Sequence, residues 1–415
     1  MEITIHRGSK EIGGTCIQLS TENTTILLDA GLPLSGTSDC LDLSKIKTDA
    51  LLISHPHQDH YGLMENLPSS VPIYIGVLAK GLIDAPRPFL KKTLPQNTFR
   101  YISPNKNFKI GDFQITPFLV DHSTPEAYAF LVESKQGSRV FYSGDIRAHG
   151  RKGFLFENLI KNPPQNIDAL LLEGTMMRRG LGEFNNEKAV YAAIVGVLEK
   201  QKNISFMITS SQNIDRIISA SNACRKTGKI LVIDFYTAWI LEKMKKVSSR
   251  VTDMEWDNVR VYAHYCHDQV LINNQDFFGD FRRRAYSHRI IKEKLLESPE
   301  MYLWIGKMSQ FKIMESYKKF GSINVIYSQW KGYLDDSSGK CYGAEQVASY
   351  RSDPQVNYVY AHTSGHAPLE DLLRLSTAID PRKVVPVHTE FPDDYKKHFS
   401  NVHLVPDGTP IKLLI

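Results

Sequence analysis

Three histidines and one aspartate lie within six residues near the amino terminus. The segment reads His55-Pro-His57-Gln-Asp59-His60 and directly follows the apolar run 50–53. A tight turn at this point can direct His55 and His57 to one cation and Asp59 and His60 to a second, using the nitrogen and oxygen ligands that zinc prefers. A solvated polar turn would explain the same residues, so ligands elsewhere in the chain must decide between the two interpretations.

Further candidate ligands follow other apolar runs. They are His122 in Val-Asp-His-Ser, Asp145 in Ser-Gly-Asp and His388 in Val-His-Thr. These residues can form two sites of three ligands each. The first site consists of His55, His57 and His122, the second of Asp59, His60 and His388, and Asp145 can bridge the two. Each site keeps room for a shared hydroxide, because water bound to zinc ionises near neutral pH and becomes a nucleophile. The set predicts a two-metal hydrolytic centre.

Short apolar strands must position these side chains. Strands are expected near 25–28, 50–53, 140–142, 169–172 and 384–387, and each delivers a polar residue at its carboxyl end. The polar residues are Asp29, His55, Asp145, Glu173 and His388. Layered α/β folds, including αββα folds, gather reactive groups along one edge of a sheet in this way.

The middle of the chain has a different pattern. A helix is expected over about 186–201, with Val190, Ile194, Val197 and Leu198 on one face. A strand at 204–209, a helix at about 214–227, a strand at 230–233 and a helix at about 239–246 continue a βαβα order that is typical of a parallel sheet. We therefore expect an inserted α/β domain over about 175–350, with a loop at 336–340 near its end.

Composition narrows the class of protein. A chain of 415 residues suits one core with a large insertion, or two domains. No apolar run approaches the roughly 20 residues that cross a bilayer, and no signal sequence is visible, so a cytoplasmic protein without a membrane partner is expected. The five cysteines are scattered and form no CxxC pair, which argues against disulfides and against a thiolate zinc site. The net charge of +5 is compatible with a polyanionic substrate.

The His-x-His-x-Asp-His segment resembles the signature of the metallo-β-lactamase superfamily. In Leu-Leu-Asp29-Ala-Gly, Asp29 matches the first motif of that superfamily, whose carboxylate supports the metal ligands from behind. All five superfamily motifs are present, and they span residues 29 to 388. The resemblance implies an αββα sandwich that binds two zinc ions, with manganese as the alternative metal.

Other motifs resemble the β-CASP nuclease branch, in which an α/β domain is inserted into the lactamase-like core. Glu173 fits motif A, His366 of His362-Thr-Ser-Gly-His366-Ala fits motif B, and His388 fits motif C. The resemblance implies that Glu173 holds the His366 imidazole and that His366 is the general acid, so Asp59, Glu173 and His366 are the expected catalytic residues. It also implies a lactamase domain over 1–175 and 351–415, with the β-CASP domain over 176–350.

Within that branch, Ser-Gly-His-Ala followed by Pro386-Val-His-Thr-Glu390, together with the segment 210–216, is most similar to ribonucleases of the RNase J type. This resemblance implies hydrolysis of single-stranded RNA threaded between two domains. The residues expected near a substrate phosphate are His362, Ser364, Ser211 and Arg216. One departure is that the chain ends at Ile415, which leaves no room for the accessory carboxyl-terminal domain of that type.

Other functions and roles stay open at this point. A DNA nuclease of the same branch, a small-molecule ester or thioester hydrolase, and an inactive RNA-binding subunit are the alternatives. The runs 178–179 and 282–284 hold arginines that could grip phosphates or merely face solvent. Tyr327, Trp330 and Tyr333 are spaced three apart and could stack on bases, although such spacing is more typical of a core. A homodimer is the default assembly for an enzyme of this size.

Overall fold

The computed structural model of the chain describes residues 1–34, 40–245, 251–334 and 342–413. The expected loop at 336–340 lies outside the described residues. The chain divides into two compact units. Unit 1 comprises Met1–Ile83, Leu94–Leu181 and Gly365–Ile415, and unit 2 comprises Asp84–Thr93 and Gly182–Ser364.

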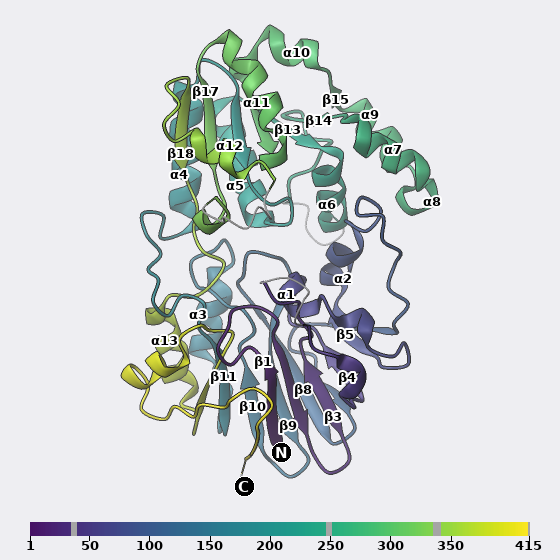
Figure 1. Cartoon of the computed structure of the whole chain (residues 1–415), viewed down its shortest axis with the longest axis vertical. Coiled ribbons are helices and arrows are strands. Elements are labelled where there is room, and N and C mark those ends of the chain that lie inside the picture. The colour runs from purple at the N-terminus through teal and green to yellow at the C-terminus, as the bar shows by residue number, and fades with distance from the viewer. Residues whose placement is uncertain (35–39, 246–250, 335–341, 414–415) are drawn as a thin grey trace. The chain divides into compact units, whose positions relative to one another are not determined.

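Unit 1 contains two mixed sheets (Figure 1). The first sheet has the strand order β20-β1-β2-β3-β4-β5-β6. Its strands are β1 (Glu2–Arg7), β2 (Cys16–Ser20), β3 (Thr25–Leu28), β4 (Ala50–Leu52), β5 (Ile73–Gly76), β6 (Phe99–Ile102) and β20 (Pro410–Lys412). The second sheet has the order β19-β11-β10-β9-β8-β7. Its strands are β7 (Phe108–Ile110), β8 (Phe113–Val120), β9 (Ala127–Ser134), β10 (Arg139–Tyr142), β11 (Ala169–Glu173) and β19 (Val384–Val387).

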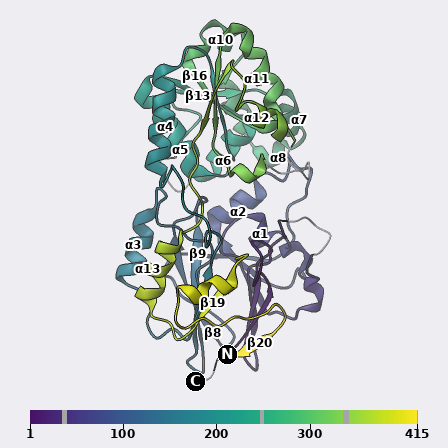
Figure 2. The same ribbon diagram turned by 60° about the vertical axis from the view of Figure 1, so that its left-hand side comes forward.

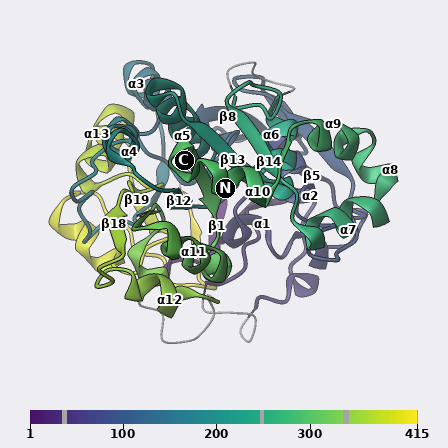
Figure 3. The ribbon, with the colours of Figure 1, turned by 90° about the horizontal axis from the view of Figure 1, so that it is seen from above.

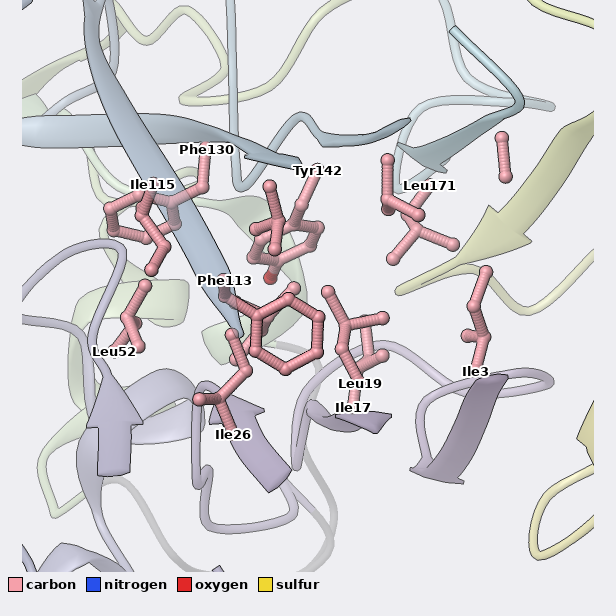
Figure 4. Packing of buried hydrophobic residues seen from close by; sticks show 14 of the residues in the cluster. Ile3, Ile17, Leu19, Ile26, Leu52, Phe113, Ile115, Phe130, Tyr142 and Leu171 are labelled. Atoms are coloured by element: carbon pink, nitrogen blue, oxygen red, sulfur yellow. The ribbon is translucent and has the colours of Figure 1, made fainter. Parts of the chain in front are cut away.

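The core of unit 1 lies between these sheets. Side chains of alternate residues, such as Ile17 and Leu19 from β2 and Phe113 and Ile115 from β8, point toward one another there (Figure 4). Three helices cover the outer faces: α2 (Val77–Asp84), α3 (Gly153–Lys161) and α13 (Leu369–Ile379). The short helix α1 (Gln58–Tyr61) lies near the end of β3. Helices α3 and α13 lie side by side (Figure 2). One apolar cluster lies beneath α2, and a separate one lies beneath this pair. These layers confirm the predicted αββα sandwich.

The carboxyl ends of several strands meet at shared sheet edges. β3 and β4 are parallel neighbours, as are β10 and β11 and then β11 and β19. Parallel neighbours end on the same side of a sheet, so the residues that follow them are brought together. Asp29 follows β3, Glu173 ends β11 and His388 follows β19.

Unit 2 is built on a sheet whose neighbouring strands all pair in parallel, in the order β15-β14-β13-β16-β12-β17-β18. Its strands are β12 (Ser205–Ile208), β13 (Ile230–Asp234), β14 (Val259–Tyr262), β15 (Arg289–Ile290), β16 (Tyr302–Gly306), β17 (Ile323–Tyr327) and β18 (Val356–Tyr360). Its helices are α4 (Glu187–Lys200), α5 (Ile214–Thr227), α6 (Phe235–Lys245), α7 (Tyr265–Asn273), α8 (Gln275–Phe278), α9 (Phe281–Ser287), α10 (Lys292–Glu297), α11 (Phe311–Tyr317) and α12 (Ala344–Ser349). Figure 3 shows α7, α8 and α9 grouped at one end of this unit.

The expected βαβα order of the middle segment is present in unit 2. Helix α5 has the predicted limits, and α4 is one residue shorter at each end. Helix α6 begins at Phe235, four residues before the predicted start, because the chain turns into the helix directly after β13. The two units do not by themselves test the predicted domain names. A lactamase domain over 1–175 and 351–415 and a β-CASP domain over 176–350 therefore stay predictions.

Candidate metal centre

The His-x-His-x-Asp-His segment turns from extended backbone into a short helix. His57 is extended and caps α1, so Asp59 and His60 lie on a helical turn whereas His55 precedes it. Gly31 allows this turn to pack against the end of β3, because a Cβ atom at residue 31 would lie 1.7 Å from the carbonyl oxygen of Asp59. The segment is thereby fixed against the sheet edge.

The first three-histidine group and Asp145 come together. The Nδ1 atom of His57 lies 3.1 Å from the Nε2 atoms of both His55 and His122. The Asp145 Oδ2 atom lies 3.5 Å from His55 Nε2 and 3.9 Å from His122 Nε2. All but His57 are buried.

The second group forms around the other side of Asp145. Asp59, His60 and His388 bring one donor atom each within 4.8 Å of the others. The Asp145 Oδ2 atom lies 3.2 Å from His60 Nε2, and its Oδ1 atom lies 3.9 Å from His388 Nε2. Asp145 therefore lies close to both groups, and its role as a bridging ligand stays a prediction.

The donor atoms of both groups are arranged as metal ligands are, and hydrogen bonds do not satisfy all of them. Three buried donor atoms have no hydrogen-bond partner among the described residues: His60 Nε2, His388 Nε2 and Asp145 Oδ1. Ligands of a tetrahedral zinc ion at about 2.0–2.1 Å lie about 3.3 Å apart, close to the spacing of the first group. Orphaned buried polar atoms are costly, so a cation between them would satisfy the site.

The charge state of the imidazoles in the first group also suits metal binding. Burial, with neighbouring imidazoles, holds the pKa values of His55 and His122 well below the usual value. Burial lowers the pKa of His57 to about 4, despite the opposing charge of Asp59. Neutral imidazoles offer the lone pair that a metal ligand needs.

Asp29 holds the second group from behind. Its carboxylate accepts hydrogen bonds from His60 Nδ1 at 2.8 Å, from Ser54 N and Oγ at 2.7 Å each, and from the Tyr142 hydroxyl at 2.7 Å. The side chain is fully buried, and its backbone has a φ of 61°, a left-handed conformation that aspartate tolerates better than most residues. Asp29 thereby fixes the tautomer of His60 so that Nε2 faces the site.

Thr15 supports His388 in a comparable way. The Thr15 hydroxyl lies 2.7 Å from His388 Nδ1, and both residues are buried. We expect Thr15→Val to weaken metal binding about 10-fold, because a hydrogen bond that supports the candidate ligand His388 is lost. Competition with a chromophoric chelator would measure this, and Thr15→Ser should remain close to the wild type. Equal affinities of Thr15→Val and wild type would contradict the supporting role.

His366 and Glu173 form a pair beside the two ligand groups. The His366 Nδ1 atom lies 3.1 Å from Glu173 Oε2 and 3.7 Å from Asp145 Oδ2. Glu173 is buried and also accepts hydrogen bonds from the backbone amides of Ile146 and Thr175. Burial alone would lower the pKa of His366, but the carboxylates of Glu173 and Asp145 raise it to about 9. Because Nδ1 is held by Glu173, Nε2 is the nitrogen available for proton transfer.

The residues expected to contact substrate belong to unit 2. Arg216 is fully buried, pairs with Glu187 at 2.8 Å, and donates to the carbonyl oxygen of Thr363 at 3.4 Å. Ser211 is also buried and bonds the Thr237 hydroxyl at 2.7 Å. These internal partners disagree with direct phosphate contact by Arg216 or Ser211. The contacts of Arg216 suit support of the segment 361–364 instead. His362 and Ser364, in that segment, are partly exposed.

The arginine runs are engaged by carboxylates. Arg178 pairs with Asp394, and Arg179 pairs with Glu390 at 2.8 Å. In the second run, Arg282 pairs with Asp268 at 2.7 Å, and Arg283 and Arg284 also contact acidic residues. Nothing in these contacts favours a phosphate over a solvated surface.

Sequence reasoning missed several supporting residues. Thr15, Ser54 and Tyr142 contact Asp29 or ligand imidazoles, and Glu187 pairs with Arg216. Ser54 stands beside His55, and Tyr142 lies at the end of an expected strand, which were available signals. The contacts of Thr15 and Glu187 join segments far apart in the chain, and no spacing pattern indicates them.

The chain matches two family models. Residues 24–196 match a β-lactamase superfamily domain, and residues 354–404 match a Zn-dependent metallo-hydrolase RNA specificity domain. A solved structure from Enterococcus faecalis, described as a protein of unknown function, has a TM-score of 0.79 and 20% identity, with 99% of each chain covered. Together with the fold, these matches show that the chain contains a metallo-β-lactamase domain and an RNA specificity domain of metallo-hydrolases, as metal-dependent hydrolases do.

Two curated relatives match most of the chain. The chain is 24% identical to ribonuclease J of Mycoplasma genitalium, covering 92% of this chain and 67% of the relative. It is 26% identical to ribonuclease J of Helicobacter pylori strain 26695, covering 100% of this chain and 61% of the relative. The chain is thus similar, over most of its length, to ribonucleases of the J type. Within the part of the chain that the structure describes, no helix is long and apolar enough to span a membrane.

Proposed function

We propose that the protein is a zinc-dependent nuclease that hydrolyses phosphodiester bonds of single-stranded RNA. The observation that carries this proposal is the pair of donor groups around Asp145, with His366 and Glu173 directly beside them. Two zinc ions bound there would polarise the scissile phosphate and activate the attacking water. Hydrolysis forms a bond from a water oxygen to phosphorus and breaks the bond to the leaving nucleoside oxygen.

The protein side chains have separate tasks in this reaction. The first ligand group (His55, His57, His122), the second (Asp59, His60, His388) and the shared Asp145 would hold the metals. His366 would donate its Nε2 proton to the leaving alkoxide oxygen, since Glu173 holds the opposite nitrogen. Asp29 and Thr15 would keep two of the ligands in the required tautomer and orientation.

RNA is favoured over DNA by the comparisons. The segment 354–404 matches a domain described by its RNA specificity, and the relatives above are ribonucleases. His362 and Ser364 lie within that segment and, being partly exposed, are the proposed phosphate contacts. Arg216 is proposed to position the segment 361–364, which contains His362 and Ser364.

The test uses two matched substrates. Single-stranded RNA and DNA of the same sequence, each labelled at its 5′ end, are incubated with protein stripped by a chelator and with the same protein after zinc is restored. We expect loss of RNA only with zinc, and slower loss of DNA. The product ladder separates single-nucleotide release from internal cleavage.

Other outcomes would change the proposed substrate or the proposed activity. Degradation of DNA with intact RNA would support the DNA nuclease of the same branch. Stable RNA and DNA in the presence of bound zinc would refute the nuclease proposal, and ester and thioester substrates would then be tested. Manganese in place of zinc, a homodimer and a cytoplasmic location also stay predictions.

A further inference from the structure

Two exposed aromatic side chains follow strand β17 in unit 2. The side chain of Trp330 is 50% exposed and that of Tyr333 is 44% exposed. Their ring centroids lie 5.5 Å apart with nearly perpendicular planes. Tyr327, three residues before Trp330, is fully buried in the strand. Only the last two residues of the aromatic series therefore reach the surface, and we call Trp330 and Tyr333 the aromatic pair.

The backbone around Trp330 fixes the position of its indole. The Tyr327 hydroxyl donates a hydrogen bond to the carbonyl oxygen of Trp330 at 3.1 Å. Residues Lys331–Tyr333 form one turn of 3-10 helix. The indole lies over this turn, because a Cβ atom at Gly332 would lie 2.2 Å from the indole ring. A ring held in one orientation loses little entropy when a planar ligand stacks on it.

A cation and the motif-bearing strand lie beside the aromatic pair. The exposed Lys331 places its Nζ atom 4.2 Å from the centroid of the Tyr360 ring. Tyr360 ends β18, which pairs in parallel with β17 (Figure 1). The Tyr360 ring centroid lies 6.2 Å from that of His362, the proposed phosphate contact. Aromatic faces, an ammonium group and the proposed phosphate contact thus follow one another at a single sheet edge.

The charge of unit 2 suits a polyanion. Its residues include 28 lysines and arginines against 21 aspartates and glutamates, a net charge of +7. Unit 1 has 22 against 24, a net charge of −2. The net positive charge of the chain therefore resides in the unit that carries the aromatic pair, and it would raise the local concentration of nucleic acid.

We propose that Trp330 and Tyr333 form a stacking platform for unpaired bases of single-stranded RNA, with Lys331 as a neighbouring cation. The proposal rests on the proposed function and extends it to a contact for bases. Stacking on aromatic rings tolerates any base and requires bases that are free of a duplex. The platform would therefore favour single strands without a preference for sequence.

The experiment measures binding separately from cleavage. Every protein in this experiment is the zinc-loaded full chain with the background substitution His366→Ala, which slows cleavage of the RNA. Each protein is titrated with oligo(U) and with a duplex RNA of equal length. We expect Trp330→Ala to weaken oligo(U) binding about 10-fold and to leave duplex binding unchanged. The effect should persist in high salt, because stacking, unlike phosphate pairing, does not depend on counterion release. Trp330→Phe should keep most of the affinity.

A fluorescence change gives a second measure. The chain has four tryptophans, of which Trp239 and Trp304 are buried and Trp256 is partly buried. Oligo(U) should therefore quench mainly the emission of Trp330, and this quenching should disappear in Trp330→Phe. The control is Tyr265→Ala, which removes a side chain that is 73% exposed at the start of α7 in the same unit.

The outcomes separate this inference from the proposed function. Unchanged affinity of Trp330→Ala for oligo(U), or an equal loss for the duplex, would overturn the platform. Equal weakening by Tyr265→Ala would do the same, since it would indicate a general surface effect. Because binding is read without turnover, a nuclease with no platform is distinguishable from an RNA-binding protein that does not cleave.

Discussion

His366→Ala should lower the rate constant for RNA cleavage by about 10²–10⁴-fold while leaving the zinc content unchanged. The proton for the leaving alkoxide would be lost, whereas the two proposed ligand groups do not include His366. Metal analysis of the purified variant, together with single-turnover cleavage, would measure both quantities. His366 also lies near Asp145 and His388 in a third group of donors, so loss of zinc from the variant would mean that it is a ligand instead.

The identity of the leaving group provides a sharper control. A p-nitrophenyl phosphodiester has a leaving oxygen that needs no proton, so His366→Ala should affect its hydrolysis far less than RNA cleavage. Glu173→Gln should lower RNA cleavage by about 10-fold, because the ring of His366 loses its charged partner. His398→Ala, at an exposed histidine of unit 1, should have no effect. Equal losses on both substrates would argue against proton donation.

The ligand groups could be predicted because the chemistry is local and the scaffold is regular. Four of the seven proposed ligands lie within six residues, and the others lie within three residues of the ends of apolar strands. Parallel strands bring their carboxyl ends to one edge, which places Asp145 and His388 on the same side of the second sheet. The motif follows β4 in the first sheet, so its approach to these residues depends on how the two sheets pack. The contact between Glu173 and His366 was implied instead by the resemblance to β-CASP nucleases, and the two side chains lie 3.1 Å apart.

Burial inside unit 2 could not be read from the sequence. Arg216 stands in a polar segment that suggests exposure, yet Glu187, 29 residues earlier, holds it inside. The spacing of Tyr327, Trp330 and Tyr333 suggested one helical face and therefore a core. The strand ends at Tyr327, so the three side chains share no helix, and two of them are exposed. The spacing of residues predicts a shared face only if all of them belong to one helix, and the spacing itself does not indicate where a helix or strand ends.

Asp29→Ala should reduce the free energy of unfolding of unit 1 by about 3–5 kcal/mol and weaken zinc binding by about 10–100-fold. Four hydrogen bonds reach the Asp29 carboxylate, and their donors would be left without an acceptor in a fully buried site. Alanine would also be less tolerant of the left-handed backbone at this residue. Urea unfolding of the zinc-free protein and a chelator competition would measure the two effects separately.

Asp29→Asn separates charge from shape in the same prediction. The amide retains the volume and tolerates the left-handed backbone, but its NH2 group would face a donor, so we expect an intermediate loss of stability and of zinc affinity. The matched control is Glu157→Ala, which breaks the exposed pair with Arg374 in the same unit and should cost less than about 1 kcal/mol. If Asp29→Ala lost stability without losing zinc affinity, Asp29 would support only the fold. Loss of both would show that the carboxylate holding His60 also sets the geometry of the metal centre.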